Sequence, residues 1–155
     1  MYIGIVIYSE TGHTLAVAKK LKETLAASGH KVTLERVEAV GPVSPAATHV
    51  TLKTRPETEP YDVLVFGTGV RGGQPAPPMA SYLEQLPSLQ GKQVACLATG
   101  FFPVAGWGRD QTLARMKEVC EAKGAIVCGS GSVGWFSLSR RRQIVEVVEA
   151  LSGSF

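Results

Sequence analysis

The chain has 155 residues, a net charge of +3 and an isoelectric point of about 8.8, and 45% of its residues are hydrophobic. This length suits one domain over residues 1–155, with the composition of an ordinary soluble globular protein. No run of 18 apolar residues occurs, and the only basic run, at 140–142, lacks aromatic interleaving, so we expect neither a membrane span nor nucleic-acid binding. No leader segment precedes the first apolar run, and the three cysteines show no paired spacing, so we expect a cytoplasmic protein.

Five apolar runs predict β-strands, at residues 2–8, 31–37, 62–67, 93–99 and 125–129. Four of these runs are nearly continuous, as expected for strands that are covered on both faces. The run at 31–37 alternates instead, which indicates an edge strand. Cys96 and Cys128 lie within two of the continuous runs and are therefore expected to be small buried hydrophobic residues.

Helical periodicity lies between these runs, at residues 14–28, 78–85, 110–123 and 139–151. Ser139 stands where the last helix would need an N-cap. Strands that alternate with helices predict an α/β fold with a single doubly wound, five-stranded parallel sheet. Residues 39–60 fit this scheme less well, because they hold four prolines and no helix signal. We expect a long loop there, with a short extra strand at 49–53.

The stretch SETGHT, at residues 9–14, joins the first strand to the first helix. In doubly wound sheets, ligands bind beyond the carboxyl ends of the strands, so this turn lies at the expected binding edge. The helix N-terminus offers unpaired N–H groups, the hydroxyls add donors, and Gly12 allows close approach to an anion such as a phosphate monoester. No lysine is present, so the turn is not a nucleotide triphosphate loop. The alternative interpretation is that Ser9 and Thr11 only cap the helix.

Two glycine-rich stretches, GTGVRGG from Gly67 and GSGSVG from Gly129, also match the pattern of dinucleotide-binding turns. Prolines follow the first stretch closely, and no further strand follows the second. Both are therefore weak candidates for a nicotinamide site. We interpret them as flexible turns at the same edge of the sheet.

The loop Ser-x-Thr-Gly-x-Thr resembles the FMN phosphate loop of the flavodoxin family. YDVLVFGTGVRGGQPAPP, at 61–78, resembles the third strand of that family and a loop that passes the flavin ring. KQVACLATGFFPVAGWGRDQTLARM, at 92–116, resembles the fourth strand and the second loop at the ring. The resemblance covers nearly the whole chain and implies the strand order 2-1-3-4-5 with FMN as cofactor.

The resemblance also implies which residues bind the cofactor. The phosphate would be held by Ser9, the Glu10 backbone, Thr11, Gly12, His13 and Thr14. The ribityl chain would be reached by Thr68 and Thr99. The isoalloxazine ring would be framed by Gly69, Val70, Arg71, Gly72, Gly73, Gly100, Phe101, Phe102 and Trp107. No catalytic side chain and no metal ligand is implied.

Arg71 departs from the acidic surroundings of flavin in short-chain flavodoxins, and a cation near the ring should raise its reduction potential. Our first hypothesis is an FMN-binding electron-transfer protein with a redox partner protein. The second is an FMN-dependent oxidoreductase that passes electrons from NAD(P)H to a small acceptor such as a quinone. The third is a flavin-free regulatory module with the same fold. The sequence leaves open whether the chain is a monomer or a homodimer.

Overall fold

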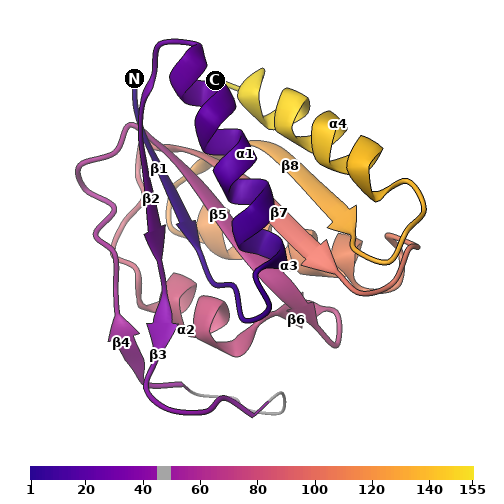
Figure 1. Ribbon diagram of the computed structural model, residues 1–155. Coiled ribbons are helices and arrows are strands. Elements are labelled where there is room, and N and C mark those ends of the chain that lie inside the picture. The colour runs from indigo at the N-terminus through magenta and orange to yellow at the C-terminus, as the bar shows by residue number, and fades with distance from the viewer. Residues whose placement is uncertain (45–49) are drawn as a thin grey trace.

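The computed structural model describes residues 1–44 and 50–155 (Figure 1). Its main sheet has the order β2-β1-β5-β7-β8, and these five strands are parallel. They are β1 (Tyr2–Ile7), β2 (Lys31–Arg36), β5 (Val63–Arg71), β7 (Gln93–Gly100) and β8 (Ile126–Gly134). This is the predicted order 2-1-3-4-5, with β2 at one edge, so the predicted fold class is confirmed. The predicted count of five strands was one too low, because the short β6 (Gln74–Pro75) also pairs with β5, antiparallel.

Four helices cover the sheet in two layers (Figure 1). The first layer holds α1 (His13–Ala27) and α4 (Arg140–Ser152), and the second holds α2 (Pro77–Gln85) and α3 (Arg109–Ala122). Each helix begins and ends within one residue of its predicted bounds. The apolar periodicity was sufficient here because each helix buries one stripe against the sheet.

The central strand β1 supplies side chains to both layers of the core. Ile3, Ile5 and Ile7 belong to the apolar cluster that includes α1 and α4, whereas Val6 belongs to the cluster that includes α2 and α3. All four side chains are fully buried. Because successive side chains of a strand point to opposite faces, a strand between two helical layers must be apolar at nearly every position.

The connection between β2 and β5 contains a second, small sheet. β3 (Glu38–Ala39) and β4 (Leu52–Thr54) pair antiparallel, and in Figure 1 they project beyond the main sheet. The extra strand predicted at 49–53 is thus found in part, at a position shifted toward the carboxyl end, while residue 49 lies outside the described residues. Within 37–44 and 50–62 the chain forms no helix, in agreement with the missing helix signal.

Both glycine-rich stretches were predicted as turns, and the structure confirms this only for Gly72 and Gly73 at the end of the first stretch. Gly67 lies within β5, and residues 129–134 lie within β8. A Cβ atom on Gly67 would stand 2.9 Å from Cγ2 of Ile7, and one on Gly131 would stand 2.9 Å from Cγ1 of Val147. These glycines permit close packing inside an extended strand and do not provide flexibility.

The prediction that the last strand is covered on both faces holds only in part, since α3 and α4 pack against β8 but leave some of its side chains exposed. β8 is an edge strand, and Ile126 is 59% exposed. Cys128 is exposed as well, although Cys96 in β7 is buried as predicted and Cys120 in α3 is also buried. An apolar run at a sheet edge cannot be distinguished by its sequence from one at the centre, because only the neighbouring strand decides its burial.

Gly4 in β1 offers a test of this close packing. A Cβ atom there would lie 2.6 Å from the ring of Tyr61, which is 5% exposed. We expect Gly4→Ala to lower the free energy of unfolding by about 1–3 kcal/mol, because the ring must move within a packed core. Urea unfolding measures the change. Gly106→Ala is the matched control, since its Cβ would meet no atom within 4 Å, and an equal loss in both variants would contradict the explanation.

Candidate functional site

The carboxyl ends of β1, β5 and β7 meet at one edge of the sheet and border a cavity of about 130 Å³. Three segments line it: the loop before α1 with the start of that helix, the end of β5, and the end of β7. The lining residues are Tyr8, Ser9, Glu10, Thr11, His13, Thr14, Gly69, Val70, Arg71, Thr99, Gly100 and Phe101. All but Tyr8 were predicted site residues. The structure does not bring Gly12, Thr68, Gly72, Gly73, Phe102 or Trp107 to the lining of this cavity.

The loop between β1 and α1 is anchored at both ends. The Tyr8 amide donates to the Gly67 carbonyl at 3.0 Å, and the Leu15 amide donates to Oγ of Ser9 at 3.3 Å. Arg36, at the end of β2, donates to the Ser9 carbonyl at 2.9 Å, a support that the sequence analysis missed. The capping interpretation therefore holds for Ser9, whose hydroxyl is used within the protein. It does not hold for Thr11.

The same loop leaves a group of donors free. Within the part of the chain that the structure describes, no group accepts a hydrogen bond from the backbone N–H of residues 10–14, and none pairs with the Thr11 hydroxyl. Gly12 has a φ of +89° and a left-handed conformation, which turns the chain into the helix. Successive unpaired amides at a helix N-terminus form a concave site for an anion.

The threonines of the site differ in what their hydroxyls can do. Thr14 and Thr99 share a buried hydrogen bond of 2.7 Å between their hydroxyl oxygens, which joins α1 to the end of β7. Thr68 is fully buried, accepts from the Ala76 amide at 3.1 Å and donates to the Gly69 carbonyl at 2.9 Å. Thr68 thus holds the end of β5 to the start of α2, and its hydroxyl is not free to bind a ligand.

An ion pair between Glu10 and Arg71 links the first loop to the end of β5 beside the cavity. Both side chains are partly exposed, at 53% and 35%. The pKa of the neighbouring Tyr8 is raised by burial and by Glu10, and Arg71 opposes this rise. Arg71 lies beside the cavity as predicted, and its charge is matched by that of Glu10, a pairing that the sequence analysis did not include.

Arg71 is carried on a tight hairpin. β6 (Gln74–Pro75) pairs antiparallel with the end of β5, so that Arg71 lies opposite Gln74. Gly72 and Gly73 form the two-residue turn with φ values of +57° and +76°. Positive φ at both positions is the requirement of a type I′ turn, which glycine meets without strain.

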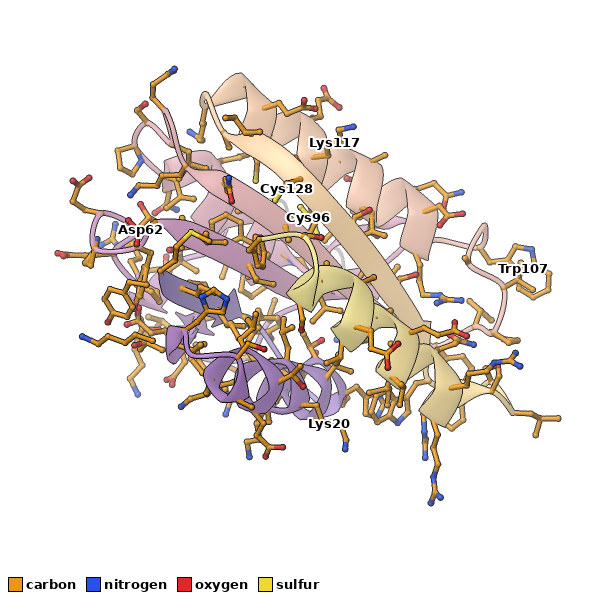
Figure 2. All side chains as sticks on the ribbon, turned by 90° about the horizontal axis from the view of Figure 1, so that it is seen from above. Lys20, Asp62, Cys96, Trp107, Lys117 and Cys128 are labelled. Carbon is orange, nitrogen blue, oxygen red and sulfur yellow. The ribbon has the colours of Figure 1, made fainter. Side chains whose placement is uncertain are left out.

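A cluster of exposed aromatic rings borders the cavity. The centroid of the Phe101 ring lies 4.5 Å from that of Phe136 and 5.4 Å from that of Phe102. The centroids of the Phe102 and Trp107 rings lie 5.8 Å apart. Figure 2 shows Trp107 at the outer part of the loop between β7 and α3. Trp107 was predicted to cover the ring of a ligand, and this structure leaves it 63% exposed. Phe136 was not predicted, because it follows a glycine-rich stretch interpreted as a turn.

His13 stacks on Trp135, with ring centroids 4.1 Å apart, and the Arg140 guanidinium lies 4.8 Å from the centroid of the same indole. Burial and the nearby Arg140 lower the pKa of His13. The imidazole is therefore mostly uncharged at neutral pH and provides a hydrogen-bonding group without a full charge.

Comparison with known proteins agrees with this architecture. No protein-family model matches the chain. An NAD(P)H dehydrogenase (quinone) of Rhodopseudomonas palustris strain BisB5 is 35% identical over 95 residues, which cover 57% of this chain and 48% of the relative. A protein with the same name from Gluconacetobacter diazotrophicus is 31% identical over 88 residues, which cover 52% and 44%. The chain therefore spans about half the length of the curated relatives it matches.

Solved structures match over all or nearly all of the chain. A flavodoxin of Streptococcus pneumoniae TIGR4 superposes with a TM-score of 0.70 over 100% of both chains, at 17% identity. A flavoprotein in complex with FMN from Lactobacillus acidophilus NCFM gives a TM-score of 0.64 at 18% identity, over 94% of this chain and 97% of the other. The chain has the flavodoxin-like fold. Within residues 1–44 and 50–155, no helix is long and apolar enough to cross a membrane, and no cluster of side chains is suited to a metal ion.

Arg109 organises this edge of the flavodoxin-like fold, although the sequence analysis overlooked it. Its side chain is 5% exposed and donates to Oγ of Ser132 at 3.1 Å, to Oε1 of Gln143 at 3.4 Å and to the Pro103 carbonyl at 2.9 Å. It thereby joins β8, α4 and the loop that carries the aromatic rings. Gly100 makes room for it, since a Cβ there would lie 2.7 Å from Cγ of Arg109.

We expect Arg109→Met to lower the free energy of unfolding by about 3 kcal/mol, because three partly buried acceptors lose their donor. Arg109→Lys keeps the charge but not the planar guanidinium group, so it should lower the free energy of unfolding by less than Arg109→Met does. Urea unfolding measures both variants. Arg115→Met, at a side chain that is 43% exposed, is the control and should change stability by less than about 0.5 kcal/mol. If the two methionine variants unfold alike, the bonds of Arg109 are not stabilising.

Proposed function

We propose that residues 1–155 form one domain that binds FMN at the carboxyl edge of the sheet and transfers electrons through it. The single observation that carries this proposal is the row of unpaired N–H groups at residues 10–14, beside the Thr11 hydroxyl and next to the cavity. A phosphate monoester is the anion that such a donor set suits, because it accepts several hydrogen bonds at once. Bound FMN would supply the redox chemistry through its isoalloxazine ring.

The cavity fits the phosphoryl end of this cofactor better than the whole molecule. Its volume of about 130 Å³ is below the 300–1,000 Å³ typical of pockets that enclose a complete ligand. The ring would therefore lie against the surface formed by the end of β5 and the loop after β7. Val70, Gly100 and Phe101 line the cavity on that side, and Phe102 and Trp107 continue the aromatic surface outward.

Electron transfer to a partner protein is the form of this function that the exposed aromatic surface favours. Direct oxidation of NAD(P)H with transfer to a quinone is a second candidate, and the two relatives named NAD(P)H dehydrogenase (quinone) support it. Purified protein that carries FMN and oxidises NADPH with a quinone but no other protein would establish the second candidate. FMN-loaded protein that stays inert toward NADPH until a reductase is added would establish the first. If the purified protein does not bind FMN, the third hypothesis, a flavin-free regulatory module, is the one that remains.

The phosphate site is tested by Thr11→Val. The valine keeps the shape of the side chain and removes one hydroxyl that would bond a charged group, so FMN affinity should fall by about 10- to 150-fold. Fluorescence titration measures the affinity for FMN and for riboflavin, and the riboflavin affinity should not change. The control is Thr24→Val, near the other end of α1, whose hydroxyl donates to the Lys20 carbonyl. An equal loss for both ligands would place the phosphate elsewhere.

Thr14 is omitted from this test because its hydroxyl is bonded to Thr99. Its replacement would disturb the packing of α1 on β7, so a loss of affinity would not identify a phosphate ligand.

Arg71 and Glu10 require a paired test. The Glu10 carboxylate lies in the loop that would hold the phosphate, so without Arg71 it would repel a dianion. We expect Arg71→Gln to weaken FMN binding by about two- to fivefold, the range of an exposed ion pair, and Glu10→Gln in the same chain to restore it. Titrations of both single variants and the double variant form a double-mutant cycle. An equal effect of Arg71→Gln with and without Glu10 would show that Arg71 contacts the ligand itself.

A further inference from the structure

Two loops that are distant in the sequence form one exposed apolar surface. We define the aromatic patch as Phe101, Phe102 and Trp107 from the loop after β7, with Phe136 and Leu138 from the loop after β8. Their exposed fractions are 65%, 51%, 63%, 61% and 110%. The phenylalanine and tryptophan rings are in contact from one loop to the other. Large apolar side chains that are gathered in this way mark an interaction surface.

The proposed flavin site does not account for the whole patch. Phe136 and Leu138 follow β8, in a loop that carries no predicted cofactor residue and does not line the cavity. Phe101 belongs to both features, since it lines the cavity and lies 4.5 Å from the Phe136 ring. The patch is therefore continuous with the proposed redox site and extends beyond it.

Positive charge predominates around the patch, because the nearby carboxylates of Glu10 and Glu146 are each paired with an arginine and Asp110 is the remaining acidic residue at the loop after β7. Arg140, Arg141 and Arg142 follow Leu138 closely at the start of α4, and segments 100–108 and 134–145 contain no acidic residue. Arg140 is packed on Trp135, and Arg142 lies 3.7 Å from Glu146 one turn farther on. Arg141 is exposed and has no ion-pair partner among the described residues. A surface of complementary charge is therefore acidic.

The loop after β8 is held in one shape by hydrogen bonds within the loop and to Gln143 in α4. The hydroxyls of Ser137 and Ser139 lie 2.9 Å apart, and Nε2 of Gln143 donates to both, at 3.0 and 2.9 Å. Oε1 of Gln143 accepts from the Gly134 amide at 2.8 Å. A preorganised surface of aromatic anchors with an arginine rim is typical of the centre of a protein–protein interface, whereas insertion into a lipid surface needs no fixed shape.

We propose that the aromatic patch and its arginines form the docking surface for an acidic redox protein, an inference that rests on the proposed function. The partner presents carboxylates around an apolar area at its own cofactor. One electron passes between the two proteins with no bond formed, so the donor is oxidised and the acceptor reduced by one electron each. The complex is of the small, transient kind, in which charge complementarity sets the association rate.

The test uses two haem proteins of opposite charge as probes, the acidic soluble domain of cytochrome b5 and the basic mitochondrial cytochrome c. Stopped-flow absorbance follows the reduction of each haem iron from ferric to ferrous by the photoreduced, FMN-loaded protein. We expect the rate with cytochrome b5 to fall at least fivefold as NaCl rises from about 10 to 300 mM, because salt screens the attraction. The rate with cytochrome c should stay constant or rise.

Two pairs of substitutions separate charge from apolar contact. Arg141→Gln with Arg142→Gln should lower the rate with cytochrome b5 about fivefold at low salt and have little effect at high salt. Phe136→Ser with Leu138→Ser should lower it at every salt concentration. The control, Lys20→Gln with Lys117→Gln, removes the same charge from α1 and α3, far from Trp107 in Figure 2, and should leave the rate unchanged.

The inference is overturned if the rate with cytochrome b5 is independent of salt or is unaffected by both pairs of substitutions. Sedimentation with phosphatidylglycerol vesicles that is lost in Phe136→Ser with Leu138→Ser would assign the patch to a membrane and also overturn it. Failure of the proposed function is recognised separately, by the absence of FMN binding. In that case, calorimetric titration of the flavin-free protein with cytochrome b5 tests the surface alone, and absence of binding overturns the inference.

Discussion

The hydrogen bonds of Arg109 hold together the edge of the sheet where the candidate site lies. Its guanidinium joins the loop after β7, the end of β8 and α4, using only neutral acceptors. Its Nε atom and the hydroxyl of Thr112 are buried and unpaired within the described residues. Desolvation lowers the pKa of Arg109, and the nearby Asp110 opposes this with a smaller effect. Burying a charge in this way is costly, and the loop that it fixes carries the candidate ring contacts.

The electrostatics of the loop between β1 and α1, the proposed phosphate site, follow a different rule, since this loop offers fixed dipoles. The unpaired amides of residues 10–14 and the N-terminus of α1 offer partial positive charges that need no desolvation of a cationic side chain. The full charges nearby are occupied, because Arg71 is paired with Glu10 and Arg36 donates to the Ser9 carbonyl. The positive potential that a ligand would meet here therefore comes from oriented N–H groups, which favour an anion with several acceptor oxygens.

How much could be predicted from the sequence depended on whether the deciding interaction was local. The helices and the strand order followed from periodicity and from the resemblance, because each element buries an apolar stripe or run. The length of β8 was not predicted, since its glycines make room for Val147 and Ser154, which belong to later parts of the chain. Likewise, the pairing of Glu10 with Arg71 was not predicted, because the two residues are 61 positions apart in the sequence. A charged residue at a helix start, such as Arg109, is expected from the sequence to be exposed to solvent. Burial of a polar side chain depends on tertiary packing, so no local sequence pattern predicts it.

The small cavity and the exposed rings have a common physical explanation. A phosphoryl group needs enclosure by donors, and the proposed FMN site assigns it to the cavity of about 130 Å³ between the first loop, β5 and β7. A flat redox-active ring needs close approach by a second molecule, because electrons pass only over short distances. An edge with a cavity beside the first loop and exposed rings on the aromatic loop would meet both requirements of the proposed site at once. The flavodoxin-like fold achieves this because its parallel strands all end at the same edge, while the loops that follow them differ in length and composition.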